Sequence, residues 1–535
     1  MANGRKLCKS VRLYQFLFAL LTVTITAVIL YKRMTWESQR DARFNADRQV
    51  NGKEDTGADE LDISKPFLGH KIVHLDLKGA APKISYLSWF FPYIKKLGAT
   101  GILIEYEDMF PYTSLDVSAK NAYSKNDIAD ILTMANKSSL EIIPLIQTFG
   151  HLEFVLKLEK YMHLREVNKY PQAICPSKEQ SLEVLKNMID DVMLMHKGYI
   201  EYLHIGCDEV YQIGECNDCK VRNYNNKWNN EDLFLAHVTT LATYIRTVYP
   251  GVTPLIWDDQ MRSISLTQLS SWKIGDLVEP VIWKYTTDVE AYLTGDLWDK
   301  YKIIFPNVWF GSAFKGAKFP DTMISPVEYY FDIHRSWKSV IAMYSNDVNF
   351  KGGILTGWQR FDHFSILCEL LPVAIPSLAI NIMYLSSNIK TLSELSVHVQ
   401  KITGCSVFIY GDKRCSFPGN SLHEEIAKFS QLIYRIKLAK NHSIFKGWMT
   451  SYNLDNAFSN PSHVEEISKE ILSLYMELME LETSIEMAMD EVYNNATTKE
   501  WINVYLEPYK NELKMIVDGR NKILATDHWP KRPIG

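Results

Sequence analysis

Asp208 and Glu209 stand side by side in the segment "LHIGCDEVYQIGEC" (residues 203–216), at the end of an apolar run. Paired carboxylates are typical of general acid/base sites, where one group moves a proton and the other stabilises positive charge. Successive residues of a strand point to opposite faces, so two neighbours on one strand would not share a cleft. A joint site therefore requires that the strand ends here and that the following loop turns both side chains the same way.

Other residues able to do chemistry also stand at the ends of apolar runs. They are His74, Asp76 and Lys78; Glu105, Glu107 and Asp108; Gln147 and His151; Trp257, Asp258 and Asp259; Trp283 and Tyr285; Trp309; and Trp358, Arg360 and Asp362. If the runs are parallel strands of one barrel, these residues gather at one end of it.

The apolar, β-branched runs number eight and predict eight strands, at 71–77, 101–107, 140–147, 201–208, 253–259, 279–285, 302–309 and 352–358. Most of the segments between them have helical periodicity. Runs that are apolar on both faces belong in parallel sheets covered by helices. The pattern predicts a (β/α)8 barrel over residues 70–373, with its active site at the carboxyl ends of the strands. An open doubly wound sheet is the alternative, but no Gly-rich phosphate loop follows the first strand.

Residues 374–535 are predicted to form a helical C-terminal domain. Between 464 and 488, apolar residues follow an unbroken 3-4 spacing that suits either a dimerising coiled coil or a helix of an intramolecular bundle. Further apolar helical patterns at 422–439 and 500–523 favour the bundle, and leave a homodimer through these helices as the alternative.

The N-terminus predicts a membrane anchor. Residues 14–31 contain no charge and are flanked by basic residues, which fits a single signal anchor better than a cleaved signal peptide. We expect a short cytoplasmic tail (1–13), a flexible stem (35–68) and a type II protein with a lumenal or extracellular barrel. Three N-x-S/T sequons, at Asn136, Asn441 and Asn495, permit this placement. Residence in the cytoplasm and nucleus is the alternative.

Charge and cysteine content limit the partners. A net charge of −5, with no basic run beyond the N-terminus, argues against a nucleic-acid partner. The eight cysteines are scattered, and Cys216 and Cys219 form a lone CxxC that could be a zinc half-site or a redox pair. With no second pair at zinc spacing, the sequence favours a loop thiol pair or local disulfide. We expect no metal and no cofactor.

Adjacency of the carboxylates favours one kind of glycoside chemistry. Ordinary retaining and inverting glycosidases separate their two carboxyl groups across the scissile bond, which two neighbouring residues fit poorly. In a third scheme the substrate's own 2-acetamido oxygen attacks the anomeric carbon. Glu209 would then be the acid/base, and Asp208 would bind and orient the acetamide. The alternative is a solvated loop pair without function.

Several motifs are similar to glycoside hydrolase family 20, the β-N-acetylhexosaminidases. The run "HIGCDEV" resembles the family's catalytic H-x-G-x-D-E motif, and "IIPLIQTFGH" resembles its strand-three segment, which implies a role for His151. "LIWDD" and "PVIWKY" resemble the strands that wall the acetamido group, and "GWQRFDH" resembles the last strand. This resemblance implies that Trp257 and Trp283 surround the acetamide and that Trp358 lies under the sugar.

The wording of "HLDLKGAAPK", "LIEYEDMFPY" and "SFPGN" is closer to an outlying branch of the family, the D-type hexosaminidases. That branch implies tolerance of, or preference for, N-acetylgalactosaminides, and its members are generally nucleocytoplasmic. The chain departs from the wider family in lacking room for a small α/β domain before the barrel. Lys78 stands near the place of a sugar-binding Arg, Arg360 replaces a carboxylate and Gln147 replaces an Asp. The acetamide-binding Tyr has no clear match; Trp309 lies nearest and Tyr285 is a second candidate.

We therefore expect a retaining exo-β-N-acetylhexosaminidase that releases terminal GlcNAc or GalNAc through an oxazolinium intermediate. An inactive carbohydrate-binding barrel is the alternative. Asp208 is expected to be ionised and Glu209 protonated, with a mildly acidic to neutral optimum, because a nearby like charge raises the pKa of the acid. The residues expected to bind substrate are His151, Trp257, Trp283, Trp309, Trp358, Asp76, Lys78, Asp258 and Tyr285.

Overall fold

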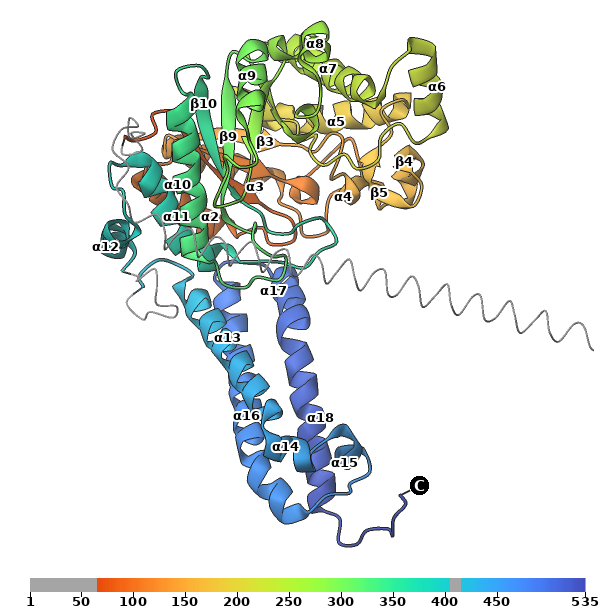
Figure 1. Cartoon of the computed structure of the whole chain (residues 1–535), viewed down its shortest axis with the longest axis vertical. Helices are drawn as coiled ribbons and strands as arrows, with labels where there is room; N and C mark the ends of the chain where they lie inside the picture. The colour runs from red at the N-terminus through yellow and green to blue at the C-terminus, as the bar shows by residue number, and fades with distance from the viewer. Residues whose placement is uncertain (1–64, 405–414, 535) are drawn as a thin grey trace, which may run out of the picture. The chain divides into compact units, whose positions relative to one another are not determined.

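The computed structural model describes residues 65–404 and 415–534. Eight parallel strands close into a barrel in the order β1-β10-β9-β8-β7-β6-β3-β2. The barrel lies in the upper part of Figure 1. The strands are β1 (His70–Asp76), β2 (Gly101–Glu105), β3 (Glu141–Leu145), β6 (Tyr202–His204), β7 (Thr253–Trp257), β8 (Glu279–Trp283), β9 (Val308–Lys315) and β10 (Phe350–Gly357).

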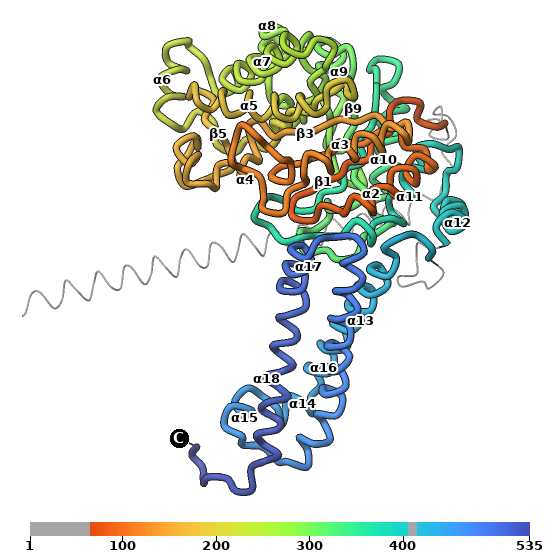
Figure 2. The backbone as a smooth tube through the Cα atoms, turned by 180° about the vertical axis from the view of Figure 1, so that it is seen from behind, coloured from red at the N-terminus to blue at the C-terminus, as the bar shows by residue number. Residues whose placement is uncertain are grey.

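Helices alternate with the strands and surround them in both views of the chain (Figures 1 and 2). Nearly every strand residue is buried, as expected for a parallel sheet covered by helices on its outer face. The main barrel helices are α2 (Ile84–Leu97), α3 (Lys125–Lys137), α5 (Glu179–His196), α7 (Asn230–Val248), α8 (Leu266–Ser271), α9 (Gly295–Ile304), α10 (Val327–Tyr344) and α11 (Leu371–Ser386). The prediction of a (β/α)8 barrel is confirmed.

One predicted strand is misplaced along the sequence. The sequence placed the seventh strand at 302–309, but this segment begins inside α9, and β9 starts only at Val308. "KIIF" has strand-like residue types, yet Leu297, Trp298 and Tyr301 form the buried face of a helix that continues to Ile304. The following "VWFGSAFK" is buried throughout and forms the strand. Packing against the barrel thus overrides local β propensity.

A small insertion follows β3. It contains α4 (Glu153–Leu156) and the antiparallel hairpin β4 (Arg165–Val167) and β5 (Tyr170–Ile174). The hairpin lies beside α6 (Asn217–Asn226), the helix after the predicted carboxylate loop (Figure 1). It therefore contacts the loop that carries Asp208 and Glu209.

The C-terminal helices fold within their own chain. α11 packs on β9, α10 and α2 and completes the barrel, so the predicted domain boundary at 373 falls just inside this helix. Beyond α12 (Leu392–Thr403), the long helices α13 (Asn420–Asn441), α16 (Pro461–Asp490) and α18 (Glu507–Leu524) pack together, with shorter α14 (Ser443–Trp448), α15 (Ser451–Asp455) and α17 (Asn495–Trp501). The apolar stripe of α16, which includes Ile471, Leu478 and Ile485, is buried against α13 and α18. These helices form the intramolecular bundle that the sequence favoured.

The predicted tail, the anchor at 14–31 and nearly all of the stem lie outside the described residues. Within 65–404 and 415–534, no helix has the length and apolar character needed to cross a membrane.

Candidate active site

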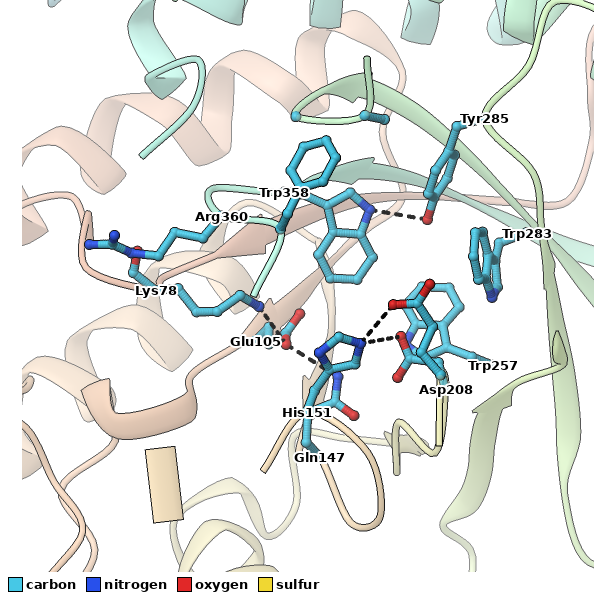
Figure 3. Close-up of a pocket in the computed structure, with 14 residues that line it drawn as sticks. Lys78, Glu105, Gln147, His151, Asp208, Trp257, Trp283, Tyr285, Trp358 and Arg360 are labelled. Atoms are coloured by element: carbon cyan, nitrogen blue, oxygen red, sulfur yellow. Dashed lines mark hydrogen bonds and ion pairs between the residues drawn. The ribbon is translucent and has the colours of Figure 1, made fainter. Parts of the chain in front are cut away.

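A cavity opens at the carboxyl ends of the barrel strands (Figure 3). Polar and aromatic side chains from seven strands or the loops after them form its wall. The lining residues are Lys78, Glu105, Gln147, His151, Asp208, Glu209, Trp257, Trp283, Tyr285, Gly316, Ala317, Trp358, Arg360 and Phe361.

Asp208 and Glu209 both face this cavity because the strand before them ends early. β6 stops at His204, and the backbone then adopts positive φ at Gly206 (65°), Cys207 (67°) and Glu209 (48°). Positive φ is unfavourable for residues with a Cβ, so the surrounding structure must hold it. The N–H of Glu209 donates to Asp259 Oδ2 at 2.9 Å, and its carbonyl accepts from Gln172 Nε2 at 2.7 Å. The predicted turn is confirmed.

His151 connects the two carboxylates. Its Nε2 lies 3.2 Å from Glu209 Oε2 and 3.7 Å from Asp208 Oδ2. Burial would lower the pKa of this imidazole, but Asp208 and the hydrogen bond to Glu209 outweigh burial and raise the pKa to about 10. His151 is therefore a cation at neutral pH and lies between the two carboxylates; Figure 3 shows it beside Asp208.

The protonation of the pair differs from the sequence expectation. Burial, with Asp259 and Glu105 nearby, raises the pKa of Asp208 to about 7 despite the opposing charge of His151. The hydrogen bond from His151 is the main cause that lowers the pKa of Glu209. In the substrate-free protein Asp208 is thus the group that more readily holds a proton. The expected order was wrong because the sequence did not show where the His151 charge lies.

A buried cation network borders the other side of the cavity. Lys78 Nζ lies 2.8 Å from Glu105 Oε1 and 3.2 Å from Asp76 Oδ1. Burial alone would lower the pKa of Lys78, but the neighbouring carboxylates raise it well above its usual value. Lys78 also lies 5.3 Å from the centre of the Trp358 ring, within range of a cation–π contact. The lysine is therefore fixed as a charged group in the wall of the cavity.

Aromatic rings form the remaining wall. Trp283 stacks on Tyr285 with ring centres 5.2 Å apart, and its Nε1 donates to Asp259 Oδ1 at 3.3 Å. Trp358 Nε1 donates to the Tyr285 hydroxyl at 3.1 Å (Figure 3). These three rings line the cavity together with Trp257. All four offer flat apolar faces beside the carboxylates, as sugar-binding sites require.

Several buried polar atoms at this end of the barrel have no hydrogen-bond partner among the described residues. They include Asp208 Oδ1, Gln147 Oε1 and Trp257 Nε1, all in residues that line the cavity. Buried polar atoms are normally paired, so a group of unpaired ones indicates a place where a ligand completes the bonding.

Three residues expected to bind substrate lie elsewhere. Trp309 is the second residue of β9, at the amino end of the barrel, and its Nε1 donates to Glu279. The carboxylate of Asp258 is bonded by Arg262 and Tyr301, and Asp76 accepts the N–H groups of Lys78 and Gln359. Both aspartates therefore support the loops around the cavity without lining it. The error for Trp309 follows from the misplaced seventh strand.

Other contributors were missed or left undecided by the sequence. Gly316 and Ala317 line the cavity directly after β9, and a correct end for that strand would have indicated them. Gln172 and Asp259 position Glu209 through its backbone, which no local motif reveals. His204 packs on Trp257 with ring centres 4.3 Å apart and accepts the Gly206 N–H, so it supports the turn before Asp208.

A cavity with two adjacent carboxylates, an ion-paired histidine and aromatic walls at the carboxyl ends of barrel strands defines a glycoside hydrolase site. Residues 92–289 match the catalytic domain of glycosyl hydrolase family 20. Hexosaminidase D from Homo sapiens is 37% identical over 482 residues, covering 88% of this chain and 98% of the relative. The chain therefore belongs to glycoside hydrolase family 20 and is an enzyme of the hexosaminidase type.

Hexosaminidase D from Bos taurus is 48% identical over 313 residues, which cover 58% of this chain and 90% of the relative. Among solved structures, a chitobiase from Flavobacterium johnsoniae aligns over 86% of this chain and 72% of its own, at 13% identity and a TM-score of 0.49. The sequence relatives, and not this distant structural likeness, establish the family.

Proposed function

We propose that the protein is a retaining exo-β-N-acetylhexosaminidase that removes terminal non-reducing GlcNAc or GalNAc by substrate-assisted catalysis. The observation that carries this proposal is that Asp208 and Glu209 enter one cavity from adjacent positions, with Asp208 Oδ1 buried and unpartnered among the described residues. That oxygen fits an acceptor for the N–H of a 2-acetamido group.

In the first step Glu209 donates a proton to the glycosidic oxygen while the acetamido oxygen attacks the anomeric carbon. The glycosidic bond breaks, and an oxazolinium ring forms as Asp208 accepts a hydrogen bond from the acetamide N–H. Glu209, now ionised, then takes a proton from water, which opens the ring and regenerates the acetamide. Two displacements at the anomeric carbon retain its configuration.

The substrate must move one proton within the pair before this reaction. Asp208 is the more readily protonated group in the substrate-free site, whereas the reaction needs the proton on Glu209. A hydrogen bond from the acetamide N–H favours ionised Asp208, and exclusion of water by the sugar disfavours ionised Glu209. Binding a 2-acetamido sugar therefore produces the reactive protonation state and also supplies the internal nucleophile, which a 2-hydroxy sugar lacks.

Recognition of the outer hydroxyls falls to the polar side of the cavity. Lys78 and Gln147 line it, and Gln147 Oε1 is a buried acceptor. Acceptance of GalNAc, or preference for it, rests on the sequence resemblance to the D-type branch. Aryl β-GlcNAc and β-GalNAc substrates compared at equal concentration give the ratio directly.

The decisive experiment varies the leaving group. The Glu209→Gln variant should lose about 10²- to 10⁴-fold in kcat on aryl β-N-acetylhexosaminides with poor leaving groups, the range usual for a general acid. On a dinitrophenyl glycoside, whose departure needs no proton, the first step should be nearly unaffected. The exposed Asp130→Asn variant on α3 is the matched control. Sugar binding without turnover by the unaltered protein would instead establish the inactive carbohydrate-binding barrel.

We also propose that residues 14–31 anchor the protein as a type II membrane protein with a lumenal or extracellular barrel. The support is the uncharged segment with basic flanks, together with the three sequons. Treatment of cell-derived protein with an N-glycan-stripping glycosidase should increase its gel mobility. An unchanged mobility would favour the alternative placement in the cytoplasm and nucleus.

A further inference from the structure

The lone CxxC gains two partners in the folded chain. Cys175 Sγ lies 3.3 Å from Cys216 Sγ and 3.5 Å from Cys219 Sγ. Glu166 Oε2 lies 3.2 Å from Cys219 Sγ. One ligand atom from each of these four residues lies within 4.8 Å of every other. We name Glu166, Cys175, Cys216 and Cys219 the thiol cluster.

The spacing of the sulfurs suits a shared metal ion. A disulfide needs about 2.05 Å between sulfurs, well below the observed separations. Tetrahedral zinc with Zn–S bonds of about 2.3 Å places its sulfur ligands about 3.8 Å apart. The observed 3.3 and 3.5 Å require only a small outward movement to reach that value. Three thiols with one carboxylate oxygen also supply the four donors of a closed structural site.

The surroundings of the thiol cluster favour a bound cation with ionised ligands. Glu166 Oε1 is already occupied by the N–H groups of Glu215 and Cys216, at 2.6 and 3.0 Å, which fixes the carboxylate and directs Oε2 toward the sulfurs. Cys216 Sγ accepts the Cys219 N–H at 3.3 Å as the side-chain cap of α6. Both contacts disperse negative charge, and they orient the ligands as the outer partners of metal sites usually do.

We propose that the thiol cluster is a structural Zn²⁺ site with Glu166, Cys175, Cys216 and Cys219 as ligands. On binding, the three thiols release their protons to solvent, and the metal accepts three sulfur donors and one oxygen donor. Cys175 and Cys219 are fully buried, so the ion is shielded from solvent on that side. This assignment replaces the expectation of no metal.

The site joins two segments that position the acid/base. Cys216 caps α6 at the end of the loop that begins with Asp208 and Glu209, and Cys219 lies in the first turn of that helix, whereas Glu166 belongs to β4 and Cys175 directly follows β5. Gln172 of the same hairpin binds the Glu209 carbonyl. Zinc therefore fixes the hairpin to the far end of the loop, while Gln172 fixes it at the near end. The metal supports the positive φ at Glu209 and takes no part in the reaction.

Metal analysis of the full chain tests the assignment without relying on activity. Protein purified under reducing conditions should contain about one zinc per chain by plasma mass spectrometry. Cys216→Ser and Cys219→Ser should each lose most of it. Cys368→Ser is the matched control, since Cys368 is a buried free cysteine outside the cluster. Zinc far below one per chain, or equal zinc in all variants, would overturn the proposal.

A second measurement covers the case in which the serine variants do not fold. The unaltered chain produced with Co²⁺ should show thiolate-to-cobalt charge-transfer absorption in the near ultraviolet, and Glu166→Gln should alter its visible bands by changing the fourth ligand. Peptide mapping without reduction should show Cys175, Cys216 and Cys219 as free thiols after metal removal. A loss of two hydrogens from a Cys175–Cys219 or Cys216–Cys219 disulfide, with no cobalt spectrum, would contradict the site even if hydrolysis is normal.

Discussion

The two ends of the barrel each place a tryptophan beside carboxylates, but the polar atoms around the two tryptophans differ in how they are paired. At the amino end, Glu279 accepts from Trp309 Nε1 at 2.7 Å, from Asn307 Nδ2 at 2.7 Å and from Lys351 Nζ at 3.0 Å. At the carboxyl end, Asp208 Oδ1 and Trp257 Nε1 are buried without a partner among the described residues.

This difference separates stability from function. A carboxylate with all its partners present contributes to the folded state and has little capacity left for a ligand. Asp208 is less stable when ionised, as its raised pKa shows, and its Oδ1 remains free to bond a ligand. The two ends should therefore respond in opposite ways to the same kind of substitution.

After Glu209→Gln, the largest effect on turnover is expected from Asp208→Asn. Replacing the charged acceptor for the acetamide N–H by a neutral amide should lower kcat/KM by about 10²- to 10³-fold, comparable to removal of one oriented group in other active sites. Because the fold raises the pKa of Asp208, ionised Asp208 destabilises the folded state more as pH rises toward 7. The variant should therefore unfold at an equal or higher temperature at neutral pH. A small loss of turnover together with a lower melting temperature would contradict the comparison.

An intermediate effect is expected from Tyr285→Phe. The substitution removes the hydroxyl that accepts from Trp358 Nε1 and leaves that donor unpaired in the cavity wall. Trp358 then loses the bond that fixes its ring in the cavity wall, so kcat/KM should fall by about tenfold. Steady-state kinetics on aryl β-N-acetylhexosaminides measures it, and Tyr292→Phe at an exposed position is the control.

The pH dependence of kcat/KM should also distinguish a substitution at the carboxyl end of the barrel from one at the amino end. The acid pair must carry one proton, so kcat/KM should fall as pH rises through about 7, the pKa of Asp208, and again in acid as Glu209 is protonated. His151→Gln removes a charge that lowers both pKa values, and both limbs should move to higher pH. His70→Gln, which removes the partner of Glu141 at the amino end, should leave both limbs in place. Identical profiles for the two variants would show that His151 does not control the pair.

The smallest effect on turnover is expected from Glu279→Gln. An amide cannot satisfy Trp309, Asn307 and Lys351 as a carboxylate does, so the free energy of unfolding should fall by about 1–3 kcal/mol. Turnover of the folded variant should stay within about twofold of normal. Urea denaturation and kinetics on the same preparation measure both, and a loss of turnover larger than the loss of stability explains would place Glu279 in the function.

Local patterns in the sequence were sufficient where the signal lies within one segment. Seven of the eight strands fall where alternating apolar runs and helical segments placed them, and Asp208, Glu209 and His151 reach the cavity because each follows such a run. The prediction of the seventh strand failed because the strand-like residues at 302–304 complete a helix whose buried face is set by packing. The prediction that Asp258 binds substrate failed because its distant partner Tyr301 and its neighbour Arg262 already bond the carboxylate.

By itself, the sequence determined the barrel, the bundle-forming helices and the carboxylates that can do the chemistry, because periodicity and residue type act over a few positions. Only the tertiary structure decided which group of the acid pair holds the proton, because burial and the His151 charge arise from segments far apart in the chain. The same is true of the thiol cluster. Glu166 and Cys175 join Cys216 and Cys219 from about 40 to 50 positions away, a separation that only the packing of the hairpin against α6 could close.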